Sequence, residues 1–115
     1  MTYWLLVFSN PVQGREDEYN EWYDNQHLPD LLRIPGVVSA RRLVAGGTQF
    51  SDESELPGKY LALYEMETEN LPTVFLEISS RVGTSGMVMS DAINLESVKT
   101  MVFSPHITNS TSNLP

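Results

Sequence analysis

His27 is the residue of this sequence best suited to proton chemistry. It is one of two histidines, the other being His106, and imidazole is the side chain whose ordinary pKa lies nearest to neutral pH. Tyr23 lies one helical turn before His27, and carboxylates lie three residues away on either side, at Asp24 and Asp30. A neighbouring carboxylate can fix the tautomer of a histidine and raise its pKa. The sequence therefore predicts a general acid or base at His27, assisted by Asp30 and Tyr23.

Each of these residues also has a purely structural interpretation. His27 stands at the end of a predicted helix, 15–27, where an imidazole can bind a free carbonyl oxygen and the helix dipole favours a cation. Asp30 falls in the first turn of a short helix that follows, which suits a carboxylate. Trp22 and Tyr23 belong to an aromatic stripe at helical spacing, a pattern typical of a core, although the Tyr23 hydroxyl could reach a ligand.

Two tyrosines on a predicted strand, 59–67, are candidates for substrate binding together with Trp22. Tyr60 and Tyr64 lie on the same face of that strand, because side chains alternate along it. If this face lines a pocket, the two hydroxyls could orient a carbonyl or phenol oxygen of a ligand. If it meets a second sheet, they are interface aromatics.

Four strands and two helices must position these side chains. The spacing of apolar residues predicts them in the order strand, helix, strand, strand, helix, strand. Their predicted bounds are 3–9, 15–27, 37–44, 59–67, about 70–82 and 97–104. This β-α-β-β-α-β order is that of the ferredoxin-like α+β fold, in which one antiparallel sheet carries both helices on one face.

The predicted first helix buries one stripe and exposes another. Tyr19, Trp22, Tyr23 and Gln26 recur at i, i+3, i+4 and i+7 and form the stripe expected to be buried.

Residues 45–57 are predicted to form a loop, and residues 87–95 a loop with a short helical turn. We expect one domain over residues 1–106 and a loose tail over 107–115.

The predicted sheet is apolar on both of its faces. The strand 3–9 is apolar throughout, and Leu61 and Leu63 lie opposite the face that carries Tyr60 and Tyr64. Two helices suffice for one face, so the other is expected to pack against the sheet of a second copy of the chain.

Composition excludes several classes of function. Seven basic and fifteen acidic residues give a net charge of −8, which disfavours nucleic-acid and membrane-surface partners. The absence of cysteine excludes a disulfide framework, a thiolate zinc site and a cysteine nucleophile. Two distant histidines predict no metal site, and no residue supports a cofactor. The apolar N-terminus is about eight residues long, too short for a membrane span, and we expect a cytoplasmic protein.

Three segments of the sequence resemble the EthD-like branch of the dimeric α+β barrel superfamily. They follow the apolar first strand and read YNEWYD at 19–24, HLPDLL at 27–32 and IPG at 34–36. They cover about a third of the chain, and the remainder agrees only in the order of its elements. The loop 45–57 and the segment 87–95 depart from the resemblance.

The resemblance implies two ferredoxin-like protomers packed sheet to sheet, each with a pocket between its sheet and its helices. It also implies that His27, in its His-x-Pro-Asp motif, is a site residue with Asp30 beside it. Members of the wider superfamily include cofactor-free monooxygenases of aromatic polyketides, muconolactone isomerases, polyketide cyclases and haem-binding enzymes. Some EthD-like members are known only as accessories in degradation pathways.

Three hypotheses about function follow from the sequence. The first is an enzyme that isomerises, cyclises, dehydrates or oxidises a small apolar, aromatic or polyketide-like compound without a cofactor, with His27 as general acid or base. The second is an accessory protein that binds a metabolite in the same pocket without catalysis. The third is a module whose dimer is itself the function.

Overall fold

The computed structural model describes residues 1–115, except for the side chain of Glu53. The order of elements confirms the predicted one, and the predicted helix 15–27 and the short helix after it form continuous helical structure from residue 16 to residue 32. The elements are β1 (Thr2–Pro11), α1 (Glu16–Trp22), a π-helical segment (Tyr23–His27), α2 (Leu28–Leu32), β2 (Val37–Val44), β3 (Tyr60–Glu67), α3 (Leu71–Arg81) and β4 (Ile93–Phe103), with 3₁₀ turns at Glu53–Glu55 and Thr111–Asn113.

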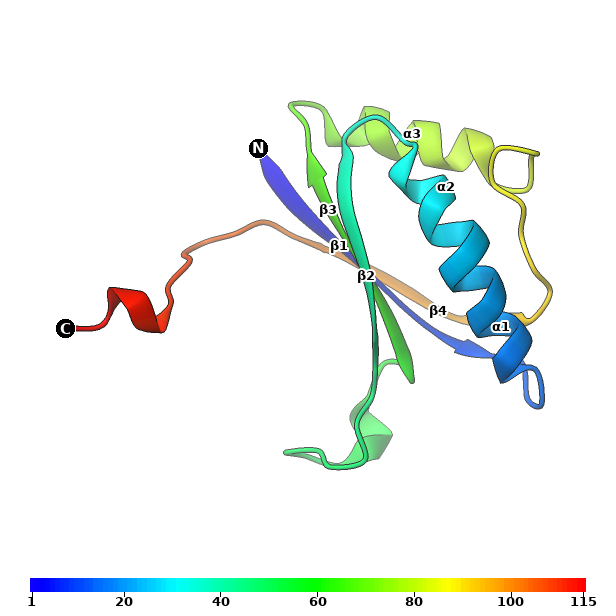
Figure 1. The fold of residues 1–115 in the computed structure, drawn as a ribbon, viewed down its shortest axis with the longest axis horizontal. Helices are drawn as coiled ribbons and strands as arrows, with labels where there is room; N and C mark the ends of the chain where they lie inside the picture. Colours follow the sequence, from blue (N-terminus) through cyan, green and yellow to red (C-terminus); the bar gives the residue numbers. More distant parts are fainter.

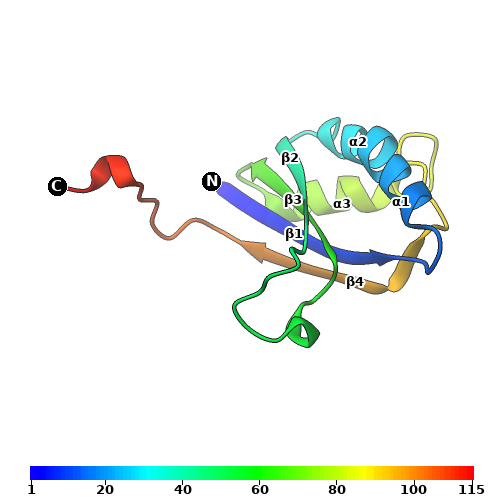
Figure 2. The ribbon, with the colours of Figure 1, turned by 60° about the horizontal axis from the view of Figure 1, so that its bottom comes forward.

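The four strands form one sheet in the order β2-β3-β1-β4. Strand β1 pairs antiparallel with both β3 and β4, and β2 pairs antiparallel with β3. The helices α1, α2 and α3 all lie on one side of this sheet (Figures 1 and 2). This topology is ferredoxin-like, as the sequence predicts.

The helical segment from α1 to α2 continues through Pro29. Proline lacks an N–H and its ring crowds the carbonyl four residues earlier, so an α-helix could not pass through this position unchanged. The chain widens instead into π-helical turns, in which the Leu28 N–H donates to the Tyr23 carbonyl, five residues earlier. Pro29 then occupies the first turn of α2, where no N–H is required of it.

This π segment changes which side chains are buried. Tyr19, Trp22 and Tyr23 are buried as predicted, but the prediction for Gln26 was wrong because its side chain is exposed. A π turn takes more residues per revolution than an α turn, so His27, one residue later, comes to lie on the buried side.

The bounds of α3 agree with the helix predicted at about 70–82, whereas β4 starts before the predicted residue 97. The Asn70 side chain caps α3 by accepting from the Thr73 N–H at 3.2 Å, and Gly83 follows the helix with φ +81°. The short helical turn predicted within 87–95 is not present in the described chain. Residues 87–92 form a loop and turn, and β4 begins at Ile93.

The two faces of the sheet differ in what covers them. Tyr3, Leu5 and Val7 of β1 pack with Tyr64 of β3 in the core beneath the helices. Cross-strand pairs on the opposite face are Leu6 with Leu63 and Met101, Trp4 with Phe103, and Phe8 and Leu43 with Leu61. We call these eight side chains the outer face: Trp4, Leu6, Phe8, Leu43, Leu61, Leu63, Met101 and Phe103.

No helix of the described chain covers the outer face (Figures 1 and 2), and Phe103 in it is 56% exposed. Beyond Phe103 the chain leaves the sheet and runs away from it to an exposed C-terminus (Figure 1). Among the described helices, none is long and apolar enough to cross a membrane.

Candidate active site

A cavity of about 190 Å³ lies between the helices and the inner face of the sheet. Its polar lining comes from Tyr23, His27, Tyr64 and Thr100, and no residue of the lining is acidic, lysine or arginine. The remaining walls are apolar: Leu5, Val7, Leu31, Ile78, Val82, Met87 and Met89. The structure thus brings three of the six predicted site residues, Tyr23, His27 and Tyr64, to one cavity.

His27 is held by aromatic rings. Its imidazole stacks on Trp22 with centroids 4.6 Å apart at 27° and meets the Tyr23 ring edge-on at 5.1 Å. Its Nδ1 is buried and has no hydrogen-bond partner within the described structure, so no helix carbonyl is bound there. Burial lowers the pKa of His27 to about 4, against the opposing effect of the Asp30 charge. The expectation of a raised pKa was therefore wrong, because desolvation outweighs the neighbouring carboxylate.

Tyr64 and Tyr23 supply two phenols to the same cavity. Tyr64 is 1% exposed, and its hydroxyl has no partner in good hydrogen-bond geometry among the described residues, although the neighbouring Tyr23 hydroxyl acts on it and contributes to its raised pKa. Burial raises the pKa of Tyr64 well above its usual value and that of Tyr23 to about 12. Both hydroxyls therefore stay protonated near neutral pH and can donate hydrogen bonds to a ligand oxygen.

Asp30 and Trp22 lie outside the cavity lining and support it. Asp30 is 4% exposed and accepts hydrogen bonds from Gln26 Nε2 at 2.8 Å and Arg33 Nη1 at 2.9 Å. The indole of Trp22 donates from Nε1 to the Val88 carbonyl at 2.9 Å, which fixes the ring on which His27 stacks. These contacts suit positioning roles more than contact with a ligand.

Tyr60 belongs to a different cluster. Its hydroxyl accepts from Asn20 Nδ2 at 3.1 Å and donates to the Glu16 carboxylate, which Lys59 also binds. Tyr60 and Tyr64 do share one face of β3, as predicted, but only Tyr64 lines the cavity. The strand pattern predicts the shared face, and it cannot locate a cavity whose other wall is a helix.

Arg42 lies against these aromatic rings, a placement that the sequence pattern, which offers both Arg41 and Arg42 as partners for an anionic ligand, cannot assign to one of the two. Its guanidinium lies over three rings, with Cζ 4.3 Å from the Tyr23 centroid, 4.8 Å from that of Tyr60 and 5.2 Å from that of Tyr19. Its Nη1 pairs with Asp24 Oδ1 at 2.8 Å, and its side chain is 10% exposed. The charge of Arg42 partly opposes the rise that burial causes in the pKa values of Tyr23 and Tyr64. A positive charge is thus held behind the phenols of the cavity.

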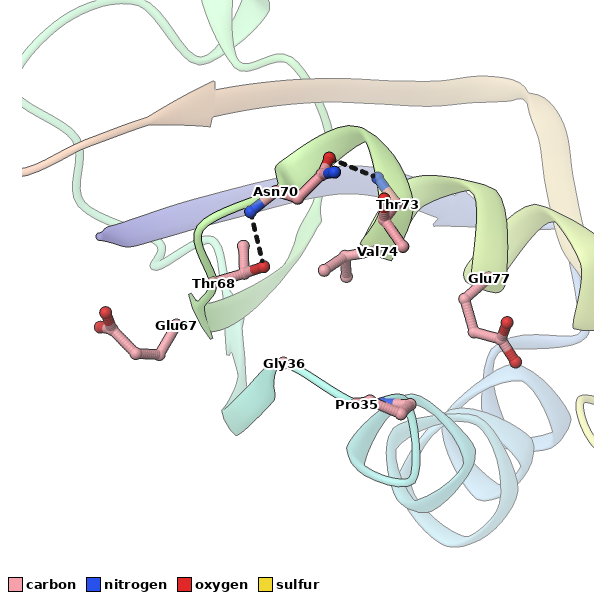
Figure 3. A pocket seen from close by; sticks show the side chains of 8 residues that line it. All are labelled: Pro35, Gly36, Glu67, Thr68, Asn70, Thr73, Val74 and Glu77. Atoms are coloured by element: carbon pink, nitrogen blue, oxygen red, sulfur yellow. Dashed lines mark hydrogen bonds between the residues drawn. The ribbon is translucent and has the colours of Figure 1, made fainter.

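A second pocket, of about 330 Å³, lies beside the N-terminal end of α3 (Figure 3). Pro35 and Gly36 form one wall, and the carboxylates of Glu67 and Glu77 lie at its margins. Its hydrogen bonds serve the helix cap at Asn70, so it offers no buried group for chemistry. Among the described residues there is also no group of three or more histidine, cysteine or acidic side chains arranged to hold a metal.

Comparison with known proteins finds a likeness of fold alone. No protein-family model matches the sequence, and no curated protein is significantly similar to it. Among solved structures, the chain is similar to an ethyl tert-butyl ether D (EthD) family protein of Bacillus halodurans C-125. The likeness is one of fold. The two chains are 14% identical, and the alignment covers 91% of this chain and 99% of the other with a TM-score of 0.48.

Proposed function

We propose that the protein is an enzyme that performs general acid/base chemistry on a small, largely apolar compound in the cavity beside His27. The observation that carries this proposal is a pair of buried polar atoms without partners, His27 Nδ1 and the Tyr64 hydroxyl, on two residues that line one apolar cavity. Three further buried atoms without partners, Asn20 Oδ1 and Arg42 Nε and Nη2, lie outside the cavity lining, so it is the shared cavity that singles out His27 and Tyr64. Leaving this pair of polar atoms unpaired costs about 1–3 kcal/mol for each of them. A ligand with a polar atom could satisfy them.

The proposed step is an isomerisation by proton transfer. The neutral imidazole of His27 takes a proton from a carbon next to a carbonyl, and the electron pair of that C–H bond forms a carbon–carbon double bond. The carbonyl π electrons move to oxygen, and the hydroxyls of Tyr64 and Tyr23 donate to the enolate so formed. Where a further carbon–carbon double bond of the substrate is conjugated with the enolate, the imidazolium returns its proton to the far carbon of that double bond. The electron pair on oxygen then restores the carbonyl, the catalyst is regenerated and no co-reactant is consumed.

The low pKa of His27 sets the strength of this base. With a pKa of about 4 the imidazole is almost entirely neutral at pH 7, so the reactive form is available. The pKa of about 4 lies 2.5 units below the 6.5 of an ordinary histidine, and this difference lowers the basicity of His27 by ~300-fold. Asp30 acts as a positioning residue that offsets part of the loss, because its charge raises the pKa.

The same low pKa favours a second candidate function. A protein that binds and hands over a metabolite needs the cavity and its hydroxyls but no basic imidazole. Such an accessory protein would bind its ligand equally well with or without His27.

Hydrogen–deuterium exchange separates the two candidates without knowledge of the product. Small cyclic ketones are incubated with the protein in D₂O, and NMR follows deuterium at the carbon next to the carbonyl. We expect exchange with the wild type and a loss of at least 100-fold in His27→Gln. The matched control is His106→Gln, which replaces the exposed histidine that follows β4 and should leave the rate unchanged. Equal exchange in the folded His27→Gln variant contradicts an acid/base role for this residue.

We further propose that two copies pack through the outer face. Its eight side chains are apolar and come from all four strands, as in a sheet-on-sheet core, and the charged residues Arg41, Glu65 and Lys99 lie beside them on the same side of the sheet. Each copy carries a net charge of −8, so repulsion opposes association and added salt should strengthen the dimer. Native mass spectrometry or sedimentation tests the assembly, and a monomer at every salt concentration would refute it.

The proposed domain boundary and location are tested separately. We propose one domain over residues 1–106, a loose tail over 107–115 and a cytoplasmic location. Limited proteolysis should remove the exposed tail first and leave a stable core. Cell fractionation tests the location.

A further inference from the structure

The size of the cavity beside His27 limits what it can hold. An apolar cavity of about 150 Å³ accommodates one benzene, which corresponds to about 25 Å³ for each non-hydrogen atom. At about 190 Å³, the cavity has room for a ligand of seven or eight such atoms. One six-membered ring with one or two substituents fits this limit, and fused rings do not.

The chemistry of the walls limits the ligand further. The lining contains no charged side chain, so an ionised carboxylate or ammonium would enter without a counter-charge, which is unfavourable in an apolar site. Met87 and Met89 lie in the wall, and thioether sulfur packs favourably against aromatic rings. The hydrogen-bonding groups come from Tyr23, His27, Tyr64 and Thr100 among apolar neighbours. An uncharged ring with a single oxygen matches this lining.

Arg42 affects the cavity without lining it. Its guanidinium lies 4.3 Å from the centroid of the Tyr23 ring and is paired through only one of its nitrogens, Nη1. The guanidinium is therefore not a direct partner for an anionic ligand. Its positive charge acts across the Tyr23 ring and stabilises negative charge that develops on a ligand oxygen. A neutral ligand that gains negative charge on its oxygen during reaction benefits most from this arrangement.

We propose that the substrate is an uncharged single-ring compound of about seven or eight non-hydrogen atoms, a phenol or the cyclohexadienone that is its tautomer, whose oxygen is bound by Tyr64. This inference rests on the proposed function, because it names the substrate class of the same site. It narrows the ligand to one ring and excludes the fused-ring, polyketide-like compounds that the sequence left open.

Binding of four probe compounds tests the proposal by ligand-observed NMR. They are p-cresol, toluene, 2-naphthol and benzoate, which differ in size, in the oxygen and in charge. We expect p-cresol to bind the wild type about fivefold more tightly than toluene, the difference that one hydrogen bond makes. We expect no saturable binding of 2-naphthol or benzoate.

Tyr64→Phe removes the proposed hydrogen bond while keeping the ring. In this variant p-cresol should bind no more tightly than toluene. Tyr3→Phe is the matched control, because the Tyr3 hydroxyl contacts Met1 Sδ away from the cavity, and it should keep the fivefold preference. Near-UV circular dichroism confirms that both variants retain their fold.

Several outcomes would overturn the inference. They are binding of 2-naphthol or benzoate as tight as that of p-cresol, a preference for p-cresol that survives Tyr64→Phe, or no binding of p-cresol at all. The proposed function fails separately, through deuterium exchange that does not depend on His27. Selective p-cresol binding without deuterium exchange would support the ligand class and refute catalysis. His27-dependent exchange of larger or charged compounds would support catalysis and refute the ligand class.

Discussion

Acid should destabilise this protein through His27 before its carboxylates are affected. The pKa of His27 is about 4 in the folded chain and 6.5 in an unfolded one, because burial disfavours the imidazolium. Between these two values the unfolded state binds more protons than the native state. The free energy of unfolding must therefore fall as the pH falls from 6.5 towards 4, and His27 contributes no dependence above that range.

The magnitude follows from the two pKa values. At pH 5 the unfolded chain is largely protonated at His27 and the folded chain is not, which costs about 2 kcal/mol of the free energy of unfolding relative to pH 7.5. The carboxyl groups with lowered pKa values act at lower pH, since their stabilisation is lost only below their ordinary values of 3.8 to 4.5. The raised pKa of the N-terminal amine acts above pH 8.0, its ordinary value, where stabilisation is lost as the pH rises. The interval from pH 5 to 7.5 therefore isolates His27.

Urea unfolding at pH 7.5 and pH 5 measures the effect, at one protein concentration so that any dimer contributes equally. His27→Gln cannot titrate and should lose little stability between the two values, whereas the wild type and His106→Gln should both lose about 2 kcal/mol. An NMR titration of the ring protons gives the pKa directly. Parallel losses in the wild type and His27→Gln, or a His27 pKa near 6.5, would refute the idea of an imidazole buried in its neutral form.

Three further substitutions test the packing. Leu63→Glu puts a charge in the middle of the outer face and should turn the proposed dimer into a monomer by sedimentation, whereas Leu76→Glu, at an exposed position of α3, should leave it dimeric. Tyr64→Phe removes a buried unpartnered hydroxyl and should raise the free energy of unfolding by about 1 kcal/mol in urea titrations; a loss of that size would mean that the hydroxyl has a partner in solution. Gly36→Ala should lower the thermal midpoint, at a cost of about 1–3 kcal/mol, because φ is +99° and the new Cβ would lie 3.1 Å from Val74 Cγ2. Gly47→Ala, with open space around it, is the control and should change little.

The sequence predicts the fold well because strand and helix periodicities are local. Strand 37–44 has the predicted bounds, and α3, at Leu71–Arg81, agrees with the helix predicted at about 70–82. The start of β4 escaped prediction because Ile93 to Leu95 lack a clear alternation. Their extended conformation depends on pairing with β1, which is a long-range contact.

The site was only partly predictable, for physical reasons that differ from residue to residue. Proximity of Asp30 to His27 in sequence suggested a raised pKa, but the extent of burial is a property of the packed chain and reverses the sign. Tyr60 and Tyr64 are equivalent in the strand pattern. The helix above them separates their roles, since α1 contributes Glu16 and Asn20 as partners for Tyr60 and leaves Tyr64 to the cavity.

Pro29 links the local sequence to the geometry of the site. Without it, an α-helix running through residues 23–27 would place Gln26, seven residues after Tyr19, in the centre of the buried stripe. The proline removes the N–H that this winding needs, and the π segment that results turns His27 inward and leaves Gln26 free to bind Asp30. The imidazole therefore lies between Trp22 and the cavity because of a proline two positions later that is not itself part of the cavity lining. The position of Pro29 thus explains the π segment at the candidate site, and this segment brings the side chain of His27 to the cavity.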